Sequence, residues 1–298
     1  MVYWRGQKPT RPSQDLRRDD AIKYGFVIPP WPVSQVVDFA VEAEDAGWDG
    51  FFLSNVPWAD DAWICLAGAA MRTSRIRLGT LLTPISCFKP WRLAAETATL
   101  DHLSGGRVIL SVGLGAPDTG FAAFGEATDR RKRAELVDEG LEIVTRIWAG
   151  ERFEHHGKHY TIDTRKIPFM PTPPVQVPRI PIWVVGAWPR PKSMQRVARY
   201  DGLLPYVKPS GKAGRSATPD DIREMHLWIE ARRELTTPLD VVIEGKTPGD
   251  DPDTALDQLR PWAEAGATWW IESLWGEEAE ETWWDRMCQG PPPNPDPA

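Results

Sequence analysis

Cysteine is scarce in this sequence. Only three occur in 298 residues, and Cys65, Cys87 and Cys288 each stand alone in their segments. Disulfide frameworks and cysteine zinc sites need paired or closely spaced cysteines, so the sequence predicts neither. No serine stands in a nucleophile-elbow sequence, which removes support for acyl-transfer chemistry. Because the cysteines are few and unpaired in the sequence, we predict a location in the reducing cytoplasm.

Positive charge and long apolar runs are also lacking. The chain has 35 Lys and Arg against 42 Asp and Glu, a net charge of -7 and a pI of about 5.4. Nucleic acids and anionic membranes attract basic surfaces, so we expect neither as a partner. No stretch approaches the roughly 18 apolar residues of a membrane span, and no apolar run follows the charged start as in a secretory signal. A small-molecule substrate is the expected partner.

The two ends of the chain differ from its middle. Residues 1–21 are polar and charged, and we predict a flexible N-terminal arm there. Residues 289–298 contain the run PPPNPDPA, and proline disfavours both helices and central strands because it lacks the N–H donor. We therefore expect a disordered C-terminal tail and one folded domain over 22–288.

Apolar runs alternate with amphipathic stretches through this domain. Eight runs are typical of buried strands: KYGFVIPP (23–30), GFFLSN (50–55), IRLGTLLTP (76–84), RVILSVGLG (107–115), RIPIWVVG (179–186), DGLLP (201–205), LDVVIEG (239–245) and TWWIES (268–273). A stretch with the residue pattern of a helix follows each of these strands. We expect Ser34 to cap the first helix before Gly47 ends it, and Thr218 to cap a helix that starts at Pro219.

This alternation predicts a parallel sheet covered by helices. Its length fits a closed (β/α)8 TIM barrel, with an insertion at about 151–179 before strand five that contains a hairpin and a proline-rich run. A doubly wound open sheet is the alternative. Such a sheet normally has a glycine-rich phosphate turn after its first strand, where this chain has Pro29-Pro30-Trp31-Pro32.

In a barrel of this kind the loops after the strands build the active site. Those loops contain no histidine and no cysteine here, because the five histidines lie in helices and in the insertion. The run HHGKH (155–159) could suggest a metal site. Adjacent His155 and His156 would point to opposite faces of a strand, and no carboxylate is spaced to complete the ligands. We predict a solvated hairpin and no metal.

Two strand ends expose main chain instead. The loop VGLGAPDTG (112–120) brings bare backbone to the rim, where N–H groups could approach a phosphate or a flat ring, although glycines there also serve as plain turn residues. The turn VVGAW (184–188) is followed by a helix at about 190, whose N-terminus would favour an anion. Together they favour a phosphorylated cofactor.

At these residues the chain resembles the luciferase-like monooxygenase family, whose members use flavin or deazaflavin F420. The resemblance runs from Tyr24 to Trp275 and is carried by AEDAGWDGFFLS (43–54), SRIRLGTLLTP (74–84), KPWRLAAETATLDHLSGGRVILSVGLGA (89–116), RAELVDEGLEIVTRIWAGERFEHHGKHY (133–160), IPIWVVGAW (180–188) and ARYDGLLP (198–205). It implies a barrel with a long insertion before strand five, a reduced F420 or FMN cofactor, a separate reductase that supplies it, and a homodimer.

The resemblance also implies particular cofactor contacts. A non-proline cis peptide in a bulge of strand three would map to Thr80-Leu81 and would place the backbone behind the redox ring. Main-chain contacts would come from the turn Gly113, Leu114 and Gly115 and from the turn Gly186, Ala187 and Trp188.

One departure from the family pattern bears on the chemistry. Relatives commonly end strand two with Trp-Asp-His, whereas this chain has Leu53-Ser54-Asn55, and Leu114 stands where some flavin-binding members have arginine. Asn55 cannot titrate near neutral pH. Asn55 could instead position the ring or an oxygen, or Glu244, Glu272 or Tyr206 could supply the proton. The barrel could also have lost its chemistry.

The charged candidate residues also have purely structural interpretations. Glu244 and Glu272 could be structural acids paired with Lys246 or an arginine, and Asp101 and Arg107 fit a structural link between a helix end and strand four. The leading hypothesis is an oxidoreductase or monooxygenase that acts on a small organic substrate with reduced cofactor from solution. A cofactor-binding barrel without turnover is the second hypothesis, and a metal hydrolase is the third.

Overall fold

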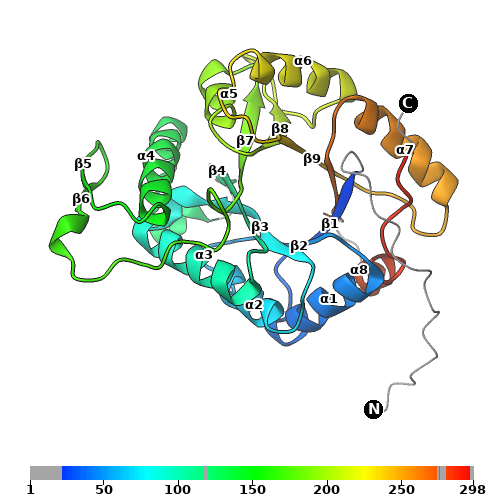
Figure 1. Ribbon diagram of the computed structural model, residues 1–298. Coiled ribbons are helices and arrows are strands. Elements are labelled where there is room, and N and C mark those ends of the chain that lie inside the picture. The colour runs from blue at the N-terminus through cyan, green and yellow to red at the C-terminus, as the bar shows by residue number, and fades with distance from the viewer. Residues whose placement is uncertain (1–21, 117–119, 274, 276–279, 296–298) are drawn as a thin grey trace.

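The strands form a closed parallel barrel. The computed structural model describes residues 22–116, 120–273, 275 and 280–295. Around the barrel the strands follow the order β1-β10-β9-β8-β7-β4-β3-β2 (Figure 1). Their bounds are β1 (Lys23–Ile28), β2 (Gly50–Leu53), β3 (Arg77–Pro84), β4 (Val108–Gly113), β7 (Ile182–Trp188), β8 (Gly202–Val207), β9 (Asp240–Gly245) and β10 (Trp269–Ser273). The predicted (β/α)8 barrel is confirmed, and β7 is its fifth strand.

Helices cover the outside of this barrel, as Figure 1 shows. They are α1 (Val33–Ala46), α2 (Ala62–Ala70), α3 (Pro90–Ser104), α4 (Arg130–Trp148), α5 (Pro191–Val197), α6 (Pro219–Glu230), α7 (Pro252–Glu264) and α8 (Glu280–Cys288). Gly47 ends α1 with φ of 97°, as expected, and Thr218 forms a capping box with Asp221. The expected Ser34 cap was wrong: α1 starts at Val33, and Pro32 precedes it without a side-chain cap.

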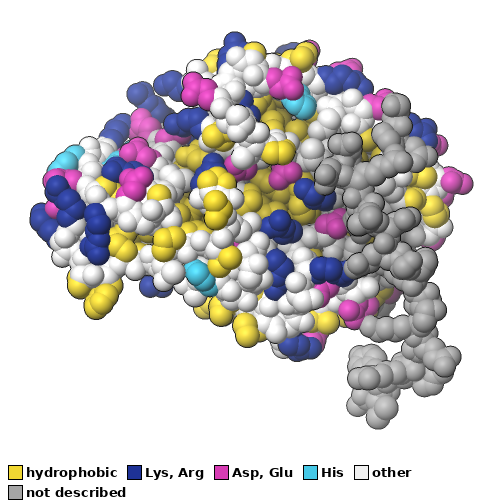
Figure 2. Space-filling view, viewed as in Figure 1, with side chains coloured by type: hydrophobic (Ala, Val, Ile, Leu, Met, Phe, Trp, Pro, Cys, Tyr) yellow, Lys and Arg dark blue, Asp and Glu magenta, His cyan; other side chains and the backbone are white. Residues whose placement is uncertain are grey.

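Two hydrophobic clusters hold the layers together. One fills the barrel interior and includes Phe52, Trp183 and Trp269, whose rings contact one another. The other lies between strands and helices. Packing in the interior requires glycine at position 50, since a Cβ there would lie 2.6 Å from the Phe52 ring. In the face shown in Figure 2, hydrophobic side chains gather over the central strands and charged ones lie around them.

The insertion forms a hairpin that docks on α4. Its strands are β5 (Glu154–His156) and β6 (Thr161–Asp163). His155 lies 3.1 Å from Glu139, and His159 lies 3.1 Å from Glu135. Lys158 and His159 lower the pKa of Glu135 to about 2. The hairpin is therefore not simply solvated as predicted, because carboxylates of α4 hold two of its histidines.

The return from the insertion is fixed to α3. Asp101 accepts hydrogen bonds from the backbone N–H groups of Val175 and Gln176 at 2.8 and 3.0 Å. Arg107 donates to the carbonyl oxygens of Ala70 and Ile76, among others, and so joins α2 to the start of β3. Asp101 and Arg107 are structural, as expected, but only Arg107 links a helix end to the start of strand four, through the carbonyl oxygen of Ser104, whereas Asp101 binds the insertion. Across the described ranges, no cluster of three or more His, Cys, Asp or Glu is placed to hold a metal ion.

The ends of the domain lie at one side of the barrel. The predicted flexible arm, residues 1–21, lies outside the described residues. Beyond α8, residues 289–295 form no helix or strand, yet the Tyr24 hydroxyl donates to the carbonyl oxygen of Pro293 at 3.1 Å. None of the helices in the described ranges combines the length and apolar character that a bilayer crossing requires.

Candidate active site

Strand alternation decides which side chains reach the mouth of the barrel. Successive residues of a strand point to opposite faces, and Leu204 and Val242 belong to the interior cluster. Tyr206 and Glu244, two residues further along β8 and β9, therefore also point inward. By the same alternation Ser273 follows Ile271 on β10 into the interior. Among the described inward-facing residues at this end, Glu244 has the only carboxyl group.

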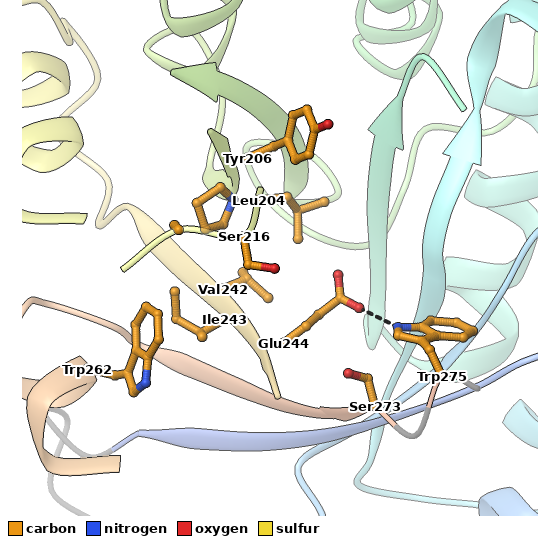
Figure 3. A pocket seen from close by; sticks show the side chains of 11 residues that line it. Leu204, Tyr206, Ser216, Val242, Ile243, Glu244, Trp262, Ser273 and Trp275 are labelled. Atoms are coloured by element: carbon orange, nitrogen blue, oxygen red, sulfur yellow. Dashed lines mark hydrogen bonds between the residues drawn. The ribbon is translucent and has the colours of Figure 1, made fainter. Parts of the chain in front are cut away.

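Glu244 is held by a residue that follows the next strand, β10. The indole Nε1 of Trp275 donates to Oε2 of Glu244 at 2.9 Å (Figure 3). Glu244 is exposed to solvent through the open mouth, but neighbouring protein groups crowd its carboxyl group, and this desolvation raises its pKa above the usual range, against the opposing effect of the Trp275 hydrogen bond. Glu244 thus retains its proton to higher pH than a glutamate with an ordinary pKa does.

Glu272 occupies a different environment. It follows the interior residue Ile271, points outward to the helix layer and is 0% exposed. Its oxygens accept from the N–H and hydroxyl of Thr247 at 2.7 Å each, and Oε2 lies 3.2 Å from Arg286. Burial raises the pKa of Glu272, whereas Arg286 and Thr247 oppose that rise. Since it cannot contact a ligand at the mouth, we correct its expected role to that of a structural acid.

Asn55 also lies behind the mouth rather than in it. Its side-chain amide donates to Oγ1 of Thr83 at 3.1 Å, and Thr83 lies 2.7 Å from Oγ1 of Thr80. Only 8% of Asn55 is exposed, and Thr80 and Thr83 are fully buried. This chain of three side chains braces β3 where its register with β4 shifts between Thr80 and Thr83. Asn55 and Thr80 therefore support the rim from behind.

The non-proline cis peptide is present in β3, one residue beyond its expected place. It joins Leu81 to Leu82, so the assignment to Thr80-Leu81 was wrong by one bond. The bulge adds one residue to β3, because Leu81 and Leu82 together lie opposite the single residue Ser111 of β4, and the cis bond joins these two residues. Leu81 belongs to the interior cluster and Leu82 packs against it.

The turn after β4 is oriented by an arginine that sequence reasoning missed. Arg133, in the first turn of α4, is 4% exposed and donates to the carbonyl oxygens of Leu114 and Gly115 at 2.8 and 3.0 Å. Within a peptide unit the N–H points opposite to the C=O. The N–H of Gly115 therefore points away from Arg133. The rest of the predicted loop, residues 117–119, lies outside the described residues.

The turn expected at 186–188 is part of a strand. Gly186, Ala187 and Trp188 belong to β7 and pair with β8. The N–H of Ala187 donates to Oγ of Ser193 at 2.9 Å, so it has a protein partner already. A Cβ at Gly186 would lie 2.4 Å from Leu203, which explains the glycine by close packing. The helix α5 that follows has only 7 residues, and we no longer expect an anion site at its start.

A cavity of about 360 Å³ opens beside these residues, between the ends of β8, β9 and β10. It is lined by Leu204, Pro205, Tyr206, Ser216, Ala217, Val242, Ile243, Glu244, Trp262, Ser273 and Trp275 (Figure 3). Of the predicted proton donors, Glu244 and Tyr206 line it and Glu272 does not. Sequence reasoning missed Ser216, Ala217 and Trp262, which come from the loop before α6 and from α7.

The adjoining rim of β3, β4 and β7 fits a flat ring in its chemistry. The glycine at 113 is explained by packing, since Leu82 and Val185 lie 2.9 Å from where its Cβ would be, and these two apolar side chains belong to the rim. Ala187 pairs with Tyr206, so this rim continues directly into the wall of the cavity. Apolar side chains beside the N–H of Gly115 suit an uncharged aromatic ring system with hydrogen-bond acceptors.

Comparison with known proteins identifies the family. A family model described as luciferase-like monooxygenase matches residues 16–284. This chain belongs to the luciferase-like monooxygenase family. The family resemblance seen in the sequence is thereby confirmed.

Named relatives of this luciferase-like protein include an F420-dependent glucose-6-phosphate dehydrogenase from Kineococcus radiotolerans. The two are 30% identical over 246 residues, which cover 78% of this chain and 70% of the relative. Among solved structures, a coenzyme F420-dependent tetrahydromethanopterin reductase from Methanopyrus kandleri matches with a TM-score of 0.70 at 19% identity, over 90% of this chain and 97% of the other. The oxygenating constituent of 3,6-diketocamphane monooxygenase from Pseudomonas putida, in complex with FMN, gives 0.65 at 17% identity, over 90% and 96%.

Proposed function

We propose that this protein is an F420-dependent oxidoreductase that transfers hydride between the cofactor and an uncharged alcohol or carbonyl substrate. The observation that supports it most is the carboxyl group of Glu244, which faces the mouth with a raised pKa. Hydride transfer to a carbonyl carbon leaves negative charge on oxygen, and a nearby acid that can donate a proton lowers the barrier. The F420-dependent relatives at 30% identity point to the same cofactor.

Each residue at the mouth has its own role in the proposed reaction. The bound deazaflavin supplies or accepts the hydride. Glu244 donates a proton to the substrate oxygen during reduction and accepts it during oxidation. Trp275 fixes the carboxyl group through its hydrogen bond of 2.9 Å. Glu244 thus takes over the proton transfer that Asn55 cannot perform, because an amide does not titrate in this range.

The rim of β3, β4 and β7 is the proposed place of the cofactor ring. Leu82, Gly113 and Ala187 would contact it, and Arg133 would keep the turn at Gly115 in position by binding its carbonyl groups. We also propose, from the family resemblance alone, that a separate reductase supplies reduced cofactor and that the protein is a cytoplasmic homodimer. FMN is the alternative cofactor, and the FMN-bound oxygenase with the same fold is the observation that favours it.

An anaerobic single-turnover experiment tests the proposal. Purified protein is mixed with reduced F420 or reduced FMN and with benzylacetone, a neutral ketone, while the cofactor absorbance is followed and the alcohol product is measured. We expect oxidised F420 and alcohol in equal amounts, and no reaction with FMN. Glu244→Gln should slow the reaction, whereas the matched control Glu264→Gln, on the exposed end of α7, should not. A second, aerobic run uses reduced FMN: product formed there, without any turnover of F420 in the anaerobic run, would refute the F420 assignment.

A further inference from the structure

The wall of the barrel is open between β8 and β9. These strands pair only through Gly202 with Asp240 and Leu203 with Val241. The residues that follow on the two strands are not paired with each other, and Leu204, Tyr206, Val242 and Glu244 among them line the cavity. Its lining therefore combines inward-facing Leu204 and Glu244 with residues on the helix side of the wall, such as Ile243 and Trp262. We call this space the seam cavity.

The two ends of the seam cavity differ in polarity. Figure 3 shows Trp262 and Trp275 on opposite sides, with the carboxyl group of Glu244 directed toward Trp275. At the Trp275 end lie Glu244 and Ser273, whereas the Tyr206 ring lies at the top of the view, away from both tryptophans. Toward the Trp262 end lies Ile243, which belongs to the outer core, and Trp262 itself packs against that core. A ligand that matches this gradient has an oxygen at one end and apolar carbon at the other.

The lack of basic residues around the seam cavity restricts the class of ligand further. None of the described residues that line the seam cavity is Lys, Arg or His. The undescribed residues beside Trp275, at 274 and 276–279, include no basic residue in the sequence either. Arg215 precedes Ser216 but binds Asp221 through both terminal nitrogens, at 2.6 and 3.0 Å. A phosphate group there would lose hydration without gaining a counter-charge, which is costly.

We propose that the seam cavity binds the apolar part of an uncharged, non-phosphorylated alcohol or ketone and presents its oxygen to Glu244. This inference rests on the proposed function and specifies its substrate class. During reduction the carbonyl carbon gains a hydride from the reduced deazaflavin and the oxygen gains a proton from Glu244, giving the alcohol and oxidised F420. A substrate such as glucose-6-phosphate, for which the relatives are named, does not fit this cavity.

Binding to the cofactor-free protein tests the proposal separately from catalysis. Isothermal titration calorimetry measures the Kd of benzylacetone and of glucose-6-phosphate. Ala217→Phe fills the seam, Ser216→Phe narrows it from an exposed position, and Ala231→Phe at the exposed end of α6 is the matched control. We expect benzylacetone to bind at least about tenfold more weakly to both seam variants than to the wild type and the control. We expect glucose-6-phosphate not to bind.

Two results would overturn the seam assignment: unchanged benzylacetone affinity in both folded seam variants, or glucose-6-phosphate binding that either variant abolishes. Circular dichroism establishes folding, and Ser216→Phe keeps the test valid if Ala217→Phe does not fold. If the ketone binds in the seam but F420 shows no turnover, the proposed function fails and the assignment of the cavity stands. If F420 turns over but the KM for benzylacetone is unchanged in the seam variants, the assignment of the cavity fails and the proposed function stands.

Discussion

The indole of Trp275 and the carboxyl group of Glu244 are joined by a hydrogen bond of 2.9 Å across the mouth of the barrel. Trp275 follows the end of β10, whereas Glu244 stands near the end of β9. The indole N–H can only donate, so it binds an oxygen of Glu244 in either protonation state and leaves the acid proton for the substrate. This pair is the centre of the proposed chemistry.

Replacing Glu244 by Gln should reduce turnover strongly. Gln keeps the size and can accept from Trp275, but it cannot donate an acid proton, and general acid catalysis is worth roughly 100- to 10,000-fold. We expect kcat for carbonyl reduction to fall within that range while KM changes little. Steady-state kinetics measures both. Wild-type kcat in a correctly folded Glu244→Gln variant would remove Glu244 from the mechanism.

Replacing Trp275 by Phe should move the pH dependence in a defined direction. The Trp275 hydrogen bond lowers the pKa of Glu244, against the dominant effect of burial. Its loss should raise that pKa further, so the decline of the reduction rate with increasing pH should begin at higher pH than in the wild type. A rate-pH profile of both proteins checks this. A shift toward lower pH would contradict the geometry.

Asn55 should act on stability through Thr83. Removing a buried hydrogen-bond partner typically costs about 1–3 kcal/mol, and Asn55 and Thr83 are both buried. Asn55→Ala and Thr83→Val should each destabilise the fold, and the double variant should lose less than the sum of the two. Urea unfolding of the four proteins in this cycle measures the coupling. Strict additivity would show that the hydrogen bond contributes nothing.

Glu272 and Arg286 should behave as a structural ion pair. Their side chains are 0% and 7% exposed. Replacing Arg286 by Met leaves the Glu272 carboxylate buried without its counter-charge, which should cost about 3–5 kcal/mol of unfolding free energy. The double variant with Glu272→Met should recover part of this loss. Thermal unfolding tests the stability, and kcat per folded molecule should stay near that of the wild type in the double variant.

The barrel itself could be predicted from the sequence because its strands are continuous apolar runs bounded by glycine and proline. The same property hides which way each side chain points. In β10 both faces are buried by large residues, Trp269 and Ile271 on one and Trp270 on the other. The sequence therefore could not distinguish inward Ser273 from outward Glu272, and Glu272 entered the predicted site for that reason.

Other details depended on contacts between distant segments. The bulge in β3 shifts the cis bond to Leu81-Leu82, and only the pairing with β4 reveals its register. Arg133 reaches Leu114 from 19 residues away. Its place in the first turn of the helix after the glycine loop was the one available signal. The seam cavity could not be foreseen, because it exists where β8 and β9 fail to pair.

The most direct test of the account is the pH dependence of single-turnover reduction of benzylacetone by reduced F420, compared between the wild type and Glu244→Gln. Because the pKa of Glu244 is raised, the wild-type rate should stay high into the range where a glutamate with an ordinary pKa is already ionised. It should then fall as pH rises through that pKa. The Gln variant should be slow and lack this decline. The same decline in both proteins would contradict the assignment of Glu244 as the proton donor.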